Sequence, residues 1–158
     1  MNKKNNIVLQ VQINCKNIEN IPKKHIFLKW IEKVLHKKKN VYFITVRIVD
    51  KIEIKNLNYK YRRKNTSTNI LSFPLNFFFK KNKILLGDIV LCKKIIEEES
   101  FKYNKKLESR WAHMVIHGTL HLLGYDHKKN KEKNIMEKIE NKIMLSLNYE
   151  KPYFLKNS

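Results

Sequence analysis

The sequence has few of the residues that interrupt or cross-link a chain: three glycines, three prolines and two cysteines in 158 residues. Cys15 and Cys92 lie far apart in apolar, strand-like runs, which predicts buried thiols in a reducing cytosol. Long apolar runs are also missing, because Lys or Glu interrupts each one, and this excludes a membrane-spanning helix. The first residues alternate between apolar and polar, so we expect a first strand there and no signal peptide.

Acidic residues are scarce beside basic ones. The chain has 34 Lys and Arg against 14 Asp and Glu, a formal net charge of +20. The hydrophobic fraction of 42% is too high for a disordered chain, so the charge belongs to a folded body. A surface this basic attracts polyanions and predicts salt-dependent binding of RNA or DNA.

The hydrophobic patterns predict one mixed α/β (α+β) domain, with a small mixed four-stranded sheet and about five helices. We expect a catalytic domain over residues 1–148 and a C-terminal tail over 149–158. Pro74 is expected to end the third strand, and Gly87 to mark a bulge or a close approach. Expected strands are 6–14, 41–50, 69–75 and 83–92; expected helices are 23–39, 93–106, 107–123 and 131–147, with a short helix or turn at 51–64. Helical spacing nominates as core residues Ile95, Ile96, Phe101 or Tyr103, Trp111, Ile135, Met136, Ile139, Ile143 and Met144.

The most informative segment is a group of histidines in the C-terminal half. His117 and His121 are four residues apart on an expected helix, so both can reach one metal ion, and Gly124 ends that helix and returns the chain toward His127. Three His around Zn²⁺ leave a fourth position for water, the arrangement of a catalytic site. The alternative is three incidental histidines. His113 is a competing ligand, but it lies about 12 Å from His121 along the helix axis, so packing or hydrogen bonding is the favoured role.

The spacing H-x-x-x-H-x-x-G-x-x-H equals that of metzincin peptidases, which need a Glu directly after the first His as general base. Here that position is Gly118. The expected metal ligands are therefore present and the peptidase base is not. A zinc peptidase remains one alternative, and a non-catalytic RNA-binding ribosome-assembly factor with a structural zinc is another.

The segment HGTLHLLGYDH (117–127), preceded by SRWAHMVI and followed by a Glu- and Met-rich helix, closely resembles the signature of the YbeY family of bacterial rRNA-maturation endoribonucleases. Segments 57–75 and 85–92 agree with it, and the similarity spans residues 41–145. The resemblance implies a cytoplasmic, metal-dependent endoribonuclease specific for single-stranded RNA. Its roles would be maturation of the small-subunit rRNA 3′ end and ribosome quality control. It further implies one zinc per chain on His117, His121 and His127, and Arg62 as the family's functional arginine.

The sequence departs from the family pattern at residues 64–69. The usual Lys-Asp-x-Pro-Thr-Asp reads here Lys-Asn-Thr-Ser-Thr-Asn, which removes two carboxylates and a proline. No acidic role is therefore expected of this loop.

The remaining candidates are weaker. Asp126 is expected either to orient a ligand imidazole or to serve ordinary turn chemistry, and Asp88 most simply ends a strand. Aromatic residues 77–79 beside three lysines suit stacking on unpaired bases, although a hairpin that buries alternate rings is favoured. The candidate RNA-binding lysines are Lys80, Lys81 and Lys83.

Overall fold

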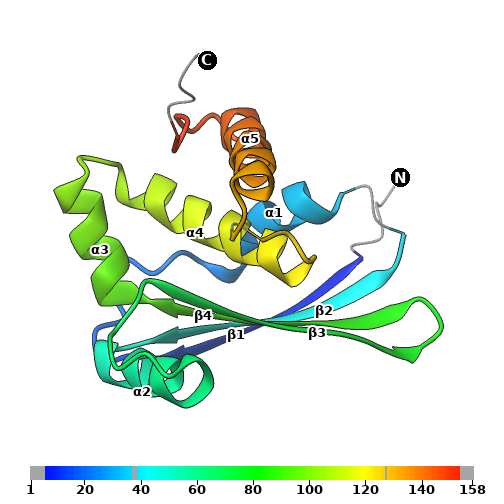
Figure 1. The fold of residues 1–158 in the computed structure, drawn as a ribbon, viewed down its shortest axis with the longest axis horizontal. Coiled ribbons are helices and arrows are strands. Elements are labelled where there is room, and N and C mark those ends of the chain that lie inside the picture. The colour runs from blue at the N-terminus through cyan, green and yellow to red at the C-terminus, as the bar shows by residue number, and fades with distance from the viewer. Residues whose placement is uncertain (1–5, 37–38, 127, 154–158) are drawn as a thin grey trace.

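The computed structural model describes residues 6–36, 39–126 and 128–153. In these ranges four strands form one mixed sheet in the order β1-β2-β4-β3, and five helices pack around it (Figure 1). β1, β2 and β4 run parallel, and β3 is antiparallel to β4 at the edge. The predicted architecture is confirmed. The elements are β1 (Ile7–Asn14), α1 (Lys24–Leu35), β2 (Val41–Val49), α2 (Lys51–Arg62), β3 (Ile70–Lys80), β4 (Lys83–Cys92), α3 (Lys93–Lys102), α4 (Leu107–Leu122) and α5 (Asn130–Ser146).

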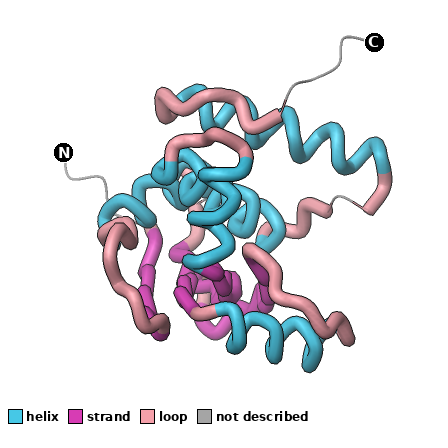
Figure 2. The backbone as a smooth tube through the Cα atoms, turned by 90° about the vertical axis from the view of Figure 1, so that its left-hand side faces the viewer, coloured by secondary structure: helices cyan, strands magenta, loops and turns pink. Residues whose placement is uncertain are grey.

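The helices divide between the two faces of the sheet. α1 and α4 pack on one face with α5 outside α4, whereas α2 covers one end of the opposite face (Figures 1 and 2). The larger core lies on the α4 side, where the fully buried Phe27, Trp30 and Trp111 meet edge to face. α4 is buried on nearly every side because the sheet, α1, α3 and α5 surround it. Its position is therefore fixed by contacts from several directions.

Gly118 lets α4 lie close against the sheet. A Cβ added at this position would lie 2.6 Å from Ile70 Cδ1, 3.2 Å from Ile89 Cγ2 and 3.2 Å from Ser72 Oγ. The Ser72 hydroxyl also donates to the Gly118 carbonyl over 3.4 Å. Gly118, the residue directly after the first histidine of the motif, therefore faces β3 and β4.

Gly87 lies at both a bulge and a close approach, as predicted. The register of β2 against β4 shifts at Ile44, which pairs with Gly87. The backbone of Gly87 has a φ of +148°, and a Cβ there would lie 2.3 Å from the Phe73 carbonyl oxygen and 2.8 Å from Leu122 Cδ2. A side chain at this position would push β3 and α4 away from β4.

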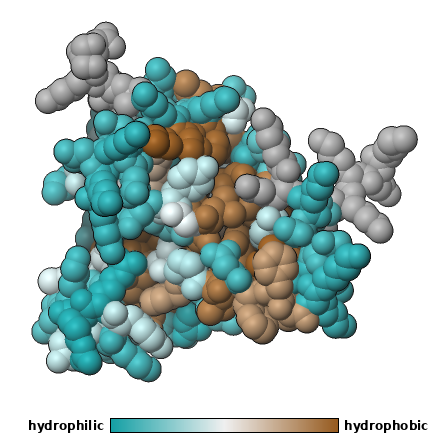
Figure 3. Space-filling view, turned by 45° about the vertical axis from the view of Figure 1, so that its right-hand side comes forward, coloured by the Kyte–Doolittle hydropathy of each residue, from teal (hydrophilic) through white to brown (hydrophobic). Residues whose placement is uncertain are grey.

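The β3–β4 hairpin differs from the sequence prediction. β3 continues past Pro74 to Lys80, with register shifts that begin at Pro74. An edge strand tolerates the proline because its missing N–H is not needed for pairing. The predicted burial of alternate rings is also wrong: Phe77 and Phe78 are 59% and 62% exposed, since the hairpin extends beyond the helices. Figure 3 shows apolar surface on this side of the molecule, bordered by hydrophilic residues.

Two expected core residues are also exposed. Phe101 and Tyr103, one of which was expected in the core, are 90% and 51% exposed near the end of α3, and Ile135 is 46% exposed in α5. Their helices bury a narrower stripe than the spacing suggests. Both cysteines are free thiols; Cys92 is fully buried and Cys15 partly buried. Among the helices of the described ranges, none is long and apolar enough to cross a membrane.

The chain beyond α5 contacts the body as far as residue 153. The Trp30 indole N–H donates to the Tyr149 hydroxyl over 3.2 Å, and that hydroxyl donates to Glu108 over 3.0 Å. The division into a domain over 1–148 and a tail over 149–158 stays a prediction.

The contacts of Gly87 predict a difference between two glycine substitutions. We expect Gly87→Ala to lower the free energy of unfolding by about 2–4 kcal/mol, since backbone strain and overpacking act together. Gly124 also has a positive φ, of +101°, but no atom of the described residues lies within 4 Å of its added Cβ. Gly124→Ala should therefore cost only the backbone strain, about 1–2 kcal/mol. Urea unfolding of both variants measures the difference, and equal losses would show that the close approach at Gly87 has no cost.

Candidate metal centre

α4 carries a row of polar side chains on one face. Ser109, His113, His117 and His121 follow one another at four-residue spacing, so they lie along one side of the helix. His113 is 5% exposed, whereas His117 and His121 are partly exposed. The Nε2 atoms of His117 and His121 lie 3.0 Å apart. The structure thus brings together two of the three histidines that the sequence nominates; His127 lies outside the described residues.

The sequence analysis did not identify Glu140, which lies at the centre of this site. Its side chain projects from α5 onto α4 and is completely buried. One carboxylate oxygen accepts a hydrogen bond from His113 Nε2 over 2.8 Å, and the other accepts one from His117 Nδ1 over 2.6 Å. Ligand atoms of His113, His117 and Glu140 all lie within 4.8 Å of one another, which makes these residues a candidate metal site.

A chain of hydrogen bonds determines which nitrogen of each imidazole carries the proton. Arg110 Nη1 lies 3.1 Å from His113 Nδ1, and an arginine can only donate, so this nitrogen accepts. His113 must then carry its proton on Nε2, which donates to Glu140. The other oxygen of Glu140 accepts from Nδ1–H of His117. A neutral His117 therefore presents a bare lone pair at Nε2, the atom that faces His121.

The pKa values agree with this arrangement. Burial lowers the pKa of His113, although Glu140 opposes that shift, and the ring stays neutral at pH 7. Burial by itself would raise the pKa of Glu140, but the hydrogen bonds from His113 and His117 outweigh it and lower this pKa to about 2. The site therefore contains a carboxylate that is ionised at neutral pH between two imidazole N–H groups.

The C-terminal segment covers the buried pair of His113 and Glu140. The Asn141 side chain hydrogen-bonds both the backbone N–H and the carbonyl of Tyr153, over 3.2 and 3.3 Å. The Tyr153 ring packs edge-on against His113 with a centroid distance of 5.2 Å. Burial and the nearby Glu140 raise the pKa of Tyr153 well above its usual range, so its hydroxyl stays protonated.

A cleft of about 810 Å³ opens beside His117 and His121. We call it the histidine cleft. Arg62, the last residue of α2, and Lys64 also line it. The remaining lining residues are Thr68, Asn69, Ile70, Ser72, Pro74, Gly124, Tyr125, Asp126 and Lys128. Arg62 and the two histidines, which are 55 or more positions apart in the sequence, thus share one cleft.

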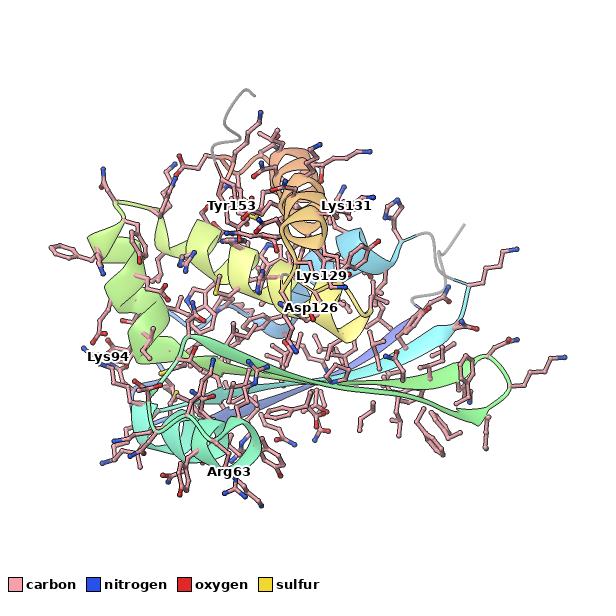
Figure 4. All side chains as sticks on the ribbon, in the orientation of Figure 1. Arg63, Lys94, Asp126, Lys129, Lys131 and Tyr153 are labelled. Carbon is pink, nitrogen blue, oxygen red and sulfur yellow. The ribbon has the colours of Figure 1, made fainter. Side chains whose placement is uncertain are left out.

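Arg62 and Arg63 are adjacent in the sequence but have different surroundings in the structure. Arg63 takes the left-handed conformation that ends α2, with φ of 58°, and its guanidinium lies 6.0 Å from the centre of the Tyr59 ring. Figure 4 shows it on the α2 side of the sheet, away from Asp126 at the end of α4. Arg62 lines the histidine cleft and Arg63 does not.

The other candidates are dispersed. Asp126 lines the histidine cleft, whereas Lys80, Lys81 and Lys83 are exposed at the end of the β3–β4 hairpin and do not line it. Asp88 is exposed in β4 and lines a separate hollow with Phe43 and Thr45. The lysines and Asp88 are therefore not part of the histidine cleft.

Gly118 bears on the peptidase alternative. The position that holds the catalytic Glu in metzincins faces Ile70, Ser72 and Ile89 of the sheet here, and Gly118 itself does not line the histidine cleft. A side chain at this position would collide with Ile70, and a carboxylate there would be buried next to two isoleucines, which is costly. The geometry of α4 therefore disfavours peptidase chemistry.

Glu140→Gln tests the role of the buried carboxylate. The amide keeps the shape, but its NH₂ faces an imidazole N–H in place of an acceptor, so His117 loses its orientation. We expect the affinity for zinc to fall about 10–100-fold, as measured by competition with a chromogenic chelator. Glu132→Gln, exposed in the first turn of α5, is the matched control and should keep the affinity of the unaltered protein. Equal zinc affinities of the two variants would show that Glu140 has no role in metal binding.

Comparison with known proteins identifies the family. A family model described as Endoribonuclease YbeY matches residues 10–148. A protein of that name from Buchnera aphidicola subsp. Schizaphis graminum is 73% identical over 158 residues and 100% of both chains. One from Buchnera aphidicola subsp. Acyrthosiphon pisum is 67% identical over 152 residues, 96% of this chain and 98% of the relative. A solution structure from Thermotoga maritima, 24% identical, shares the fold with a TM-score of 0.55 over 88% of this chain and 92% of that one. The resemblance inferred from the histidine motif is confirmed, and the chain belongs to the endoribonuclease YbeY family.

Proposed function

We propose that this protein is a zinc-dependent endoribonuclease that cleaves single-stranded RNA. Its proposed place of action is the cytoplasm, in maturation of the small-subunit rRNA 3′ end and in ribosome quality control. The observation that carries the cleavage proposal is the shared cleft: two imidazole nitrogens 3.0 Å apart and an arginine line the same space. The names of the relatives and the charge of +20 support an RNA substrate.

The proposed zinc ligands are Nε2 of His117, Nε2 of His121 and the imidazole of His127. Imidazole nitrogens suit zinc, and a set of three leaves a coordination position open. When bound, zinc supplies a Lewis acid and lowers the pKa of a water molecule it holds. Glu140 orients His117 and makes its Nε2 a better electron-pair donor by accepting the Nδ1 proton. Asp126, beside His127 in the sequence, is proposed to orient a ligand imidazole.

This arrangement gives His113 and Glu140 a supporting role. The atoms that would bind a metal among His113, His117 and Glu140 are engaged in hydrogen bonds with one another. A metal bound there would have to displace both bonds, whereas Nε2 of His117 already faces a second imidazole. The hydrogen-bond chain thus supports zinc on the cleft side of His117.

Arg62 is proposed to bind the phosphate group that is cleaved. A guanidinium donates two parallel hydrogen bonds to a phosphate, and Arg62 is exposed where the RNA would enter. Lys64, which lines the same cleft, adds electrostatic attraction for the RNA backbone. Lys80, Lys81 and Lys83 are proposed to contact RNA away from the cleft, where the exposed Phe77 and Phe78 offer faces for stacking.

Zinc content and cleavage together test the proposed function. The purified protein is incubated with single-stranded RNA, or with casein, in the presence and absence of a chelator. We expect about one zinc per chain, cleavage of the RNA only, and loss of cleavage with the chelator. His121→Ala should remove most of the zinc and the cleavage. His25→Ala, in exposed α1 surface, should change neither.

Three results would contradict the proposal. A zinc site that survives His121→Ala would place the metal on the His113 side of His117. Cleavage of casein would favour the peptidase, and zinc without cleavage would favour the assembly factor.

The different positions of the two arginines predict different effects of the same substitution. Arg62→Lys keeps the charge but loses the planar pair of donors, so kcat/KM for RNA should fall about 10–100-fold while zinc stays bound. Arg63→Lys, at the end of α2 and outside the histidine cleft, should change kcat/KM less than twofold. Equal losses of kcat/KM in both variants would show that Arg62 and Arg63 contribute only general positive charge.

A further inference from the structure

A second cavity, of about 550 Å³, lies on the other side of His117. It is bounded by the end of α3, by α4 and by the C-terminal segment, and it shares Asn69, Ile70 and His117 with the histidine cleft. We call it the α3 cavity. Ser109 and His113 of the polar row line the α3 cavity, and His121 lines the histidine cleft. The two spaces therefore adjoin each other along α4, where Ser109 and His121 are about 18 Å apart along the helix axis, and we call the two together the groove.

The charges of the two spaces differ. In the α3 cavity each of two cations has an acidic partner: Arg110 bonds Glu99 over 2.6 Å, and Lys105 lies 3.5 Å from Glu150. This cavity is close to neutral and is unsuited to a phosphate. The histidine cleft is lined by Arg62, Lys64 and Lys128 against the single carboxylate of Asp126. Along the groove, a positive part that suits phosphate thus adjoins a neutral part.

The lining of the α3 cavity suits a planar, polar-edged ring. Tyr103 and Tyr153 contribute aromatic rings, and the Tyr103 ring is 51% exposed. Asn69 and Ser109 contribute hydrogen-bonding groups. Oε1 of Glu99 and Nε of Arg110 are buried polar atoms without a hydrogen-bond partner among the described residues. A neutral cavity with aromatic and amide walls has the chemistry that recognises a nucleobase.

We propose that the α3 cavity binds one nucleobase of the single-stranded RNA substrate, next to the phosphate that is cleaved. This inference rests on the proposed function and adds a subsite to it. A base can enter only when it is unpaired and turned away from its neighbours, because a duplex keeps its bases stacked. Preference for unpaired RNA then arises from the shape of the groove, and not from the metal site.

The experiment measures kcat/KM for a set of short unstructured RNAs in which each position in turn lacks its base. With the zinc-loaded protein, one abasic position at a fixed distance of one or two nucleotides from the cleaved bond should lower kcat/KM about tenfold. Stacking on an aromatic ring is worth about 1–3 kcal/mol, and about 1.4 kcal/mol is tenfold. Abasic positions elsewhere should matter less than twofold.

Variants of Tyr103 assign that effect to the α3 cavity. Tyr103→Ala should lower kcat/KM for intact RNA about tenfold and remove the abasic penalty, because the base and the ring act as a pair. Tyr103→Phe keeps the ring and should keep the penalty. Phe101→Ala, in the last turn of α3 and two residues before Tyr103, is 90% exposed and outside the cavity and should behave like the unaltered protein.

The outcomes separate this inference from the proposed function. If intact RNA is cleaved but no abasic position lowers kcat/KM more than twofold, the subsite is wrong and the nuclease stands. The subsite is also wrong if the penalty persists unchanged in Tyr103→Ala. If intact RNA is not cleaved at all, both proposals fail.

Discussion

The geometry of the candidate metal centre depends on one buried carboxylate. Glu140 is fully buried and bonds two imidazoles of the neighbouring helix. A buried charge is tolerable only when it is well paired and hydrogen-bonded, and these two N–H groups meet that condition. Arg110 adds a cation at the far end of the hydrogen-bond chain. Arg110 can only donate and the ionised Glu140 can only accept, so together they fix the direction of each bond in the chain, and a neutral His117 presents a bare Nε2 to the cleft.

The position of α4 connects this chain to the fold. Gly118 allows the helix to approach β3 and β4 closely, while α5 brings Glu140 onto its other side. The segment from the end of α2 into β3 then adds further lining residues to the cleft, Arg62 and Lys64 among them. The histidines are thus held by a helix that is packed on nearly all sides, and the groups that face them are more exposed. Such a division suits a rigid metal centre beside a surface that receives a long, flexible substrate.

Much of this arrangement is predictable from the sequence, where local pattern is strong. The alternation in 41–49 and the four-residue spacing of His117 and His121 are local signals, and both correspond to the observed elements. The prediction that Pro74 ends the third strand was wrong because a strand at the edge of a sheet tolerates a proline. Whether a strand lies at an edge is a property of the whole sheet and not of the local sequence. The prediction of buried rings was wrong for Phe77 and Phe78 because the hairpin extends past the helices that would cover them.

Glu140 was missed because its partners lie 23 and 27 positions away on another helix. One signal was present: Glu140 lies between Met136 and Met144 at four-residue spacing, so it occupies the buried stripe of α5. A carboxylate in such a stripe needs donors, and the histidines of the preceding helix are the nearest source in the sequence. The α3 cavity had no such signal, because it is assembled from four separate segments.

The most direct test of the account is the proton position on each imidazole, read from the ¹⁵N chemical shifts of the histidine rings in the metal-free protein at pH 7. The account predicts a proton on Nδ1 and a bare Nε2 in His117, and the opposite in His113. In Arg110→Ala the donor to His113 is lost, and the preference of His113 should weaken first. A proton on Nε2 of His117 in the unaltered protein would contradict the hydrogen-bond chain, and with it the proposed zinc site.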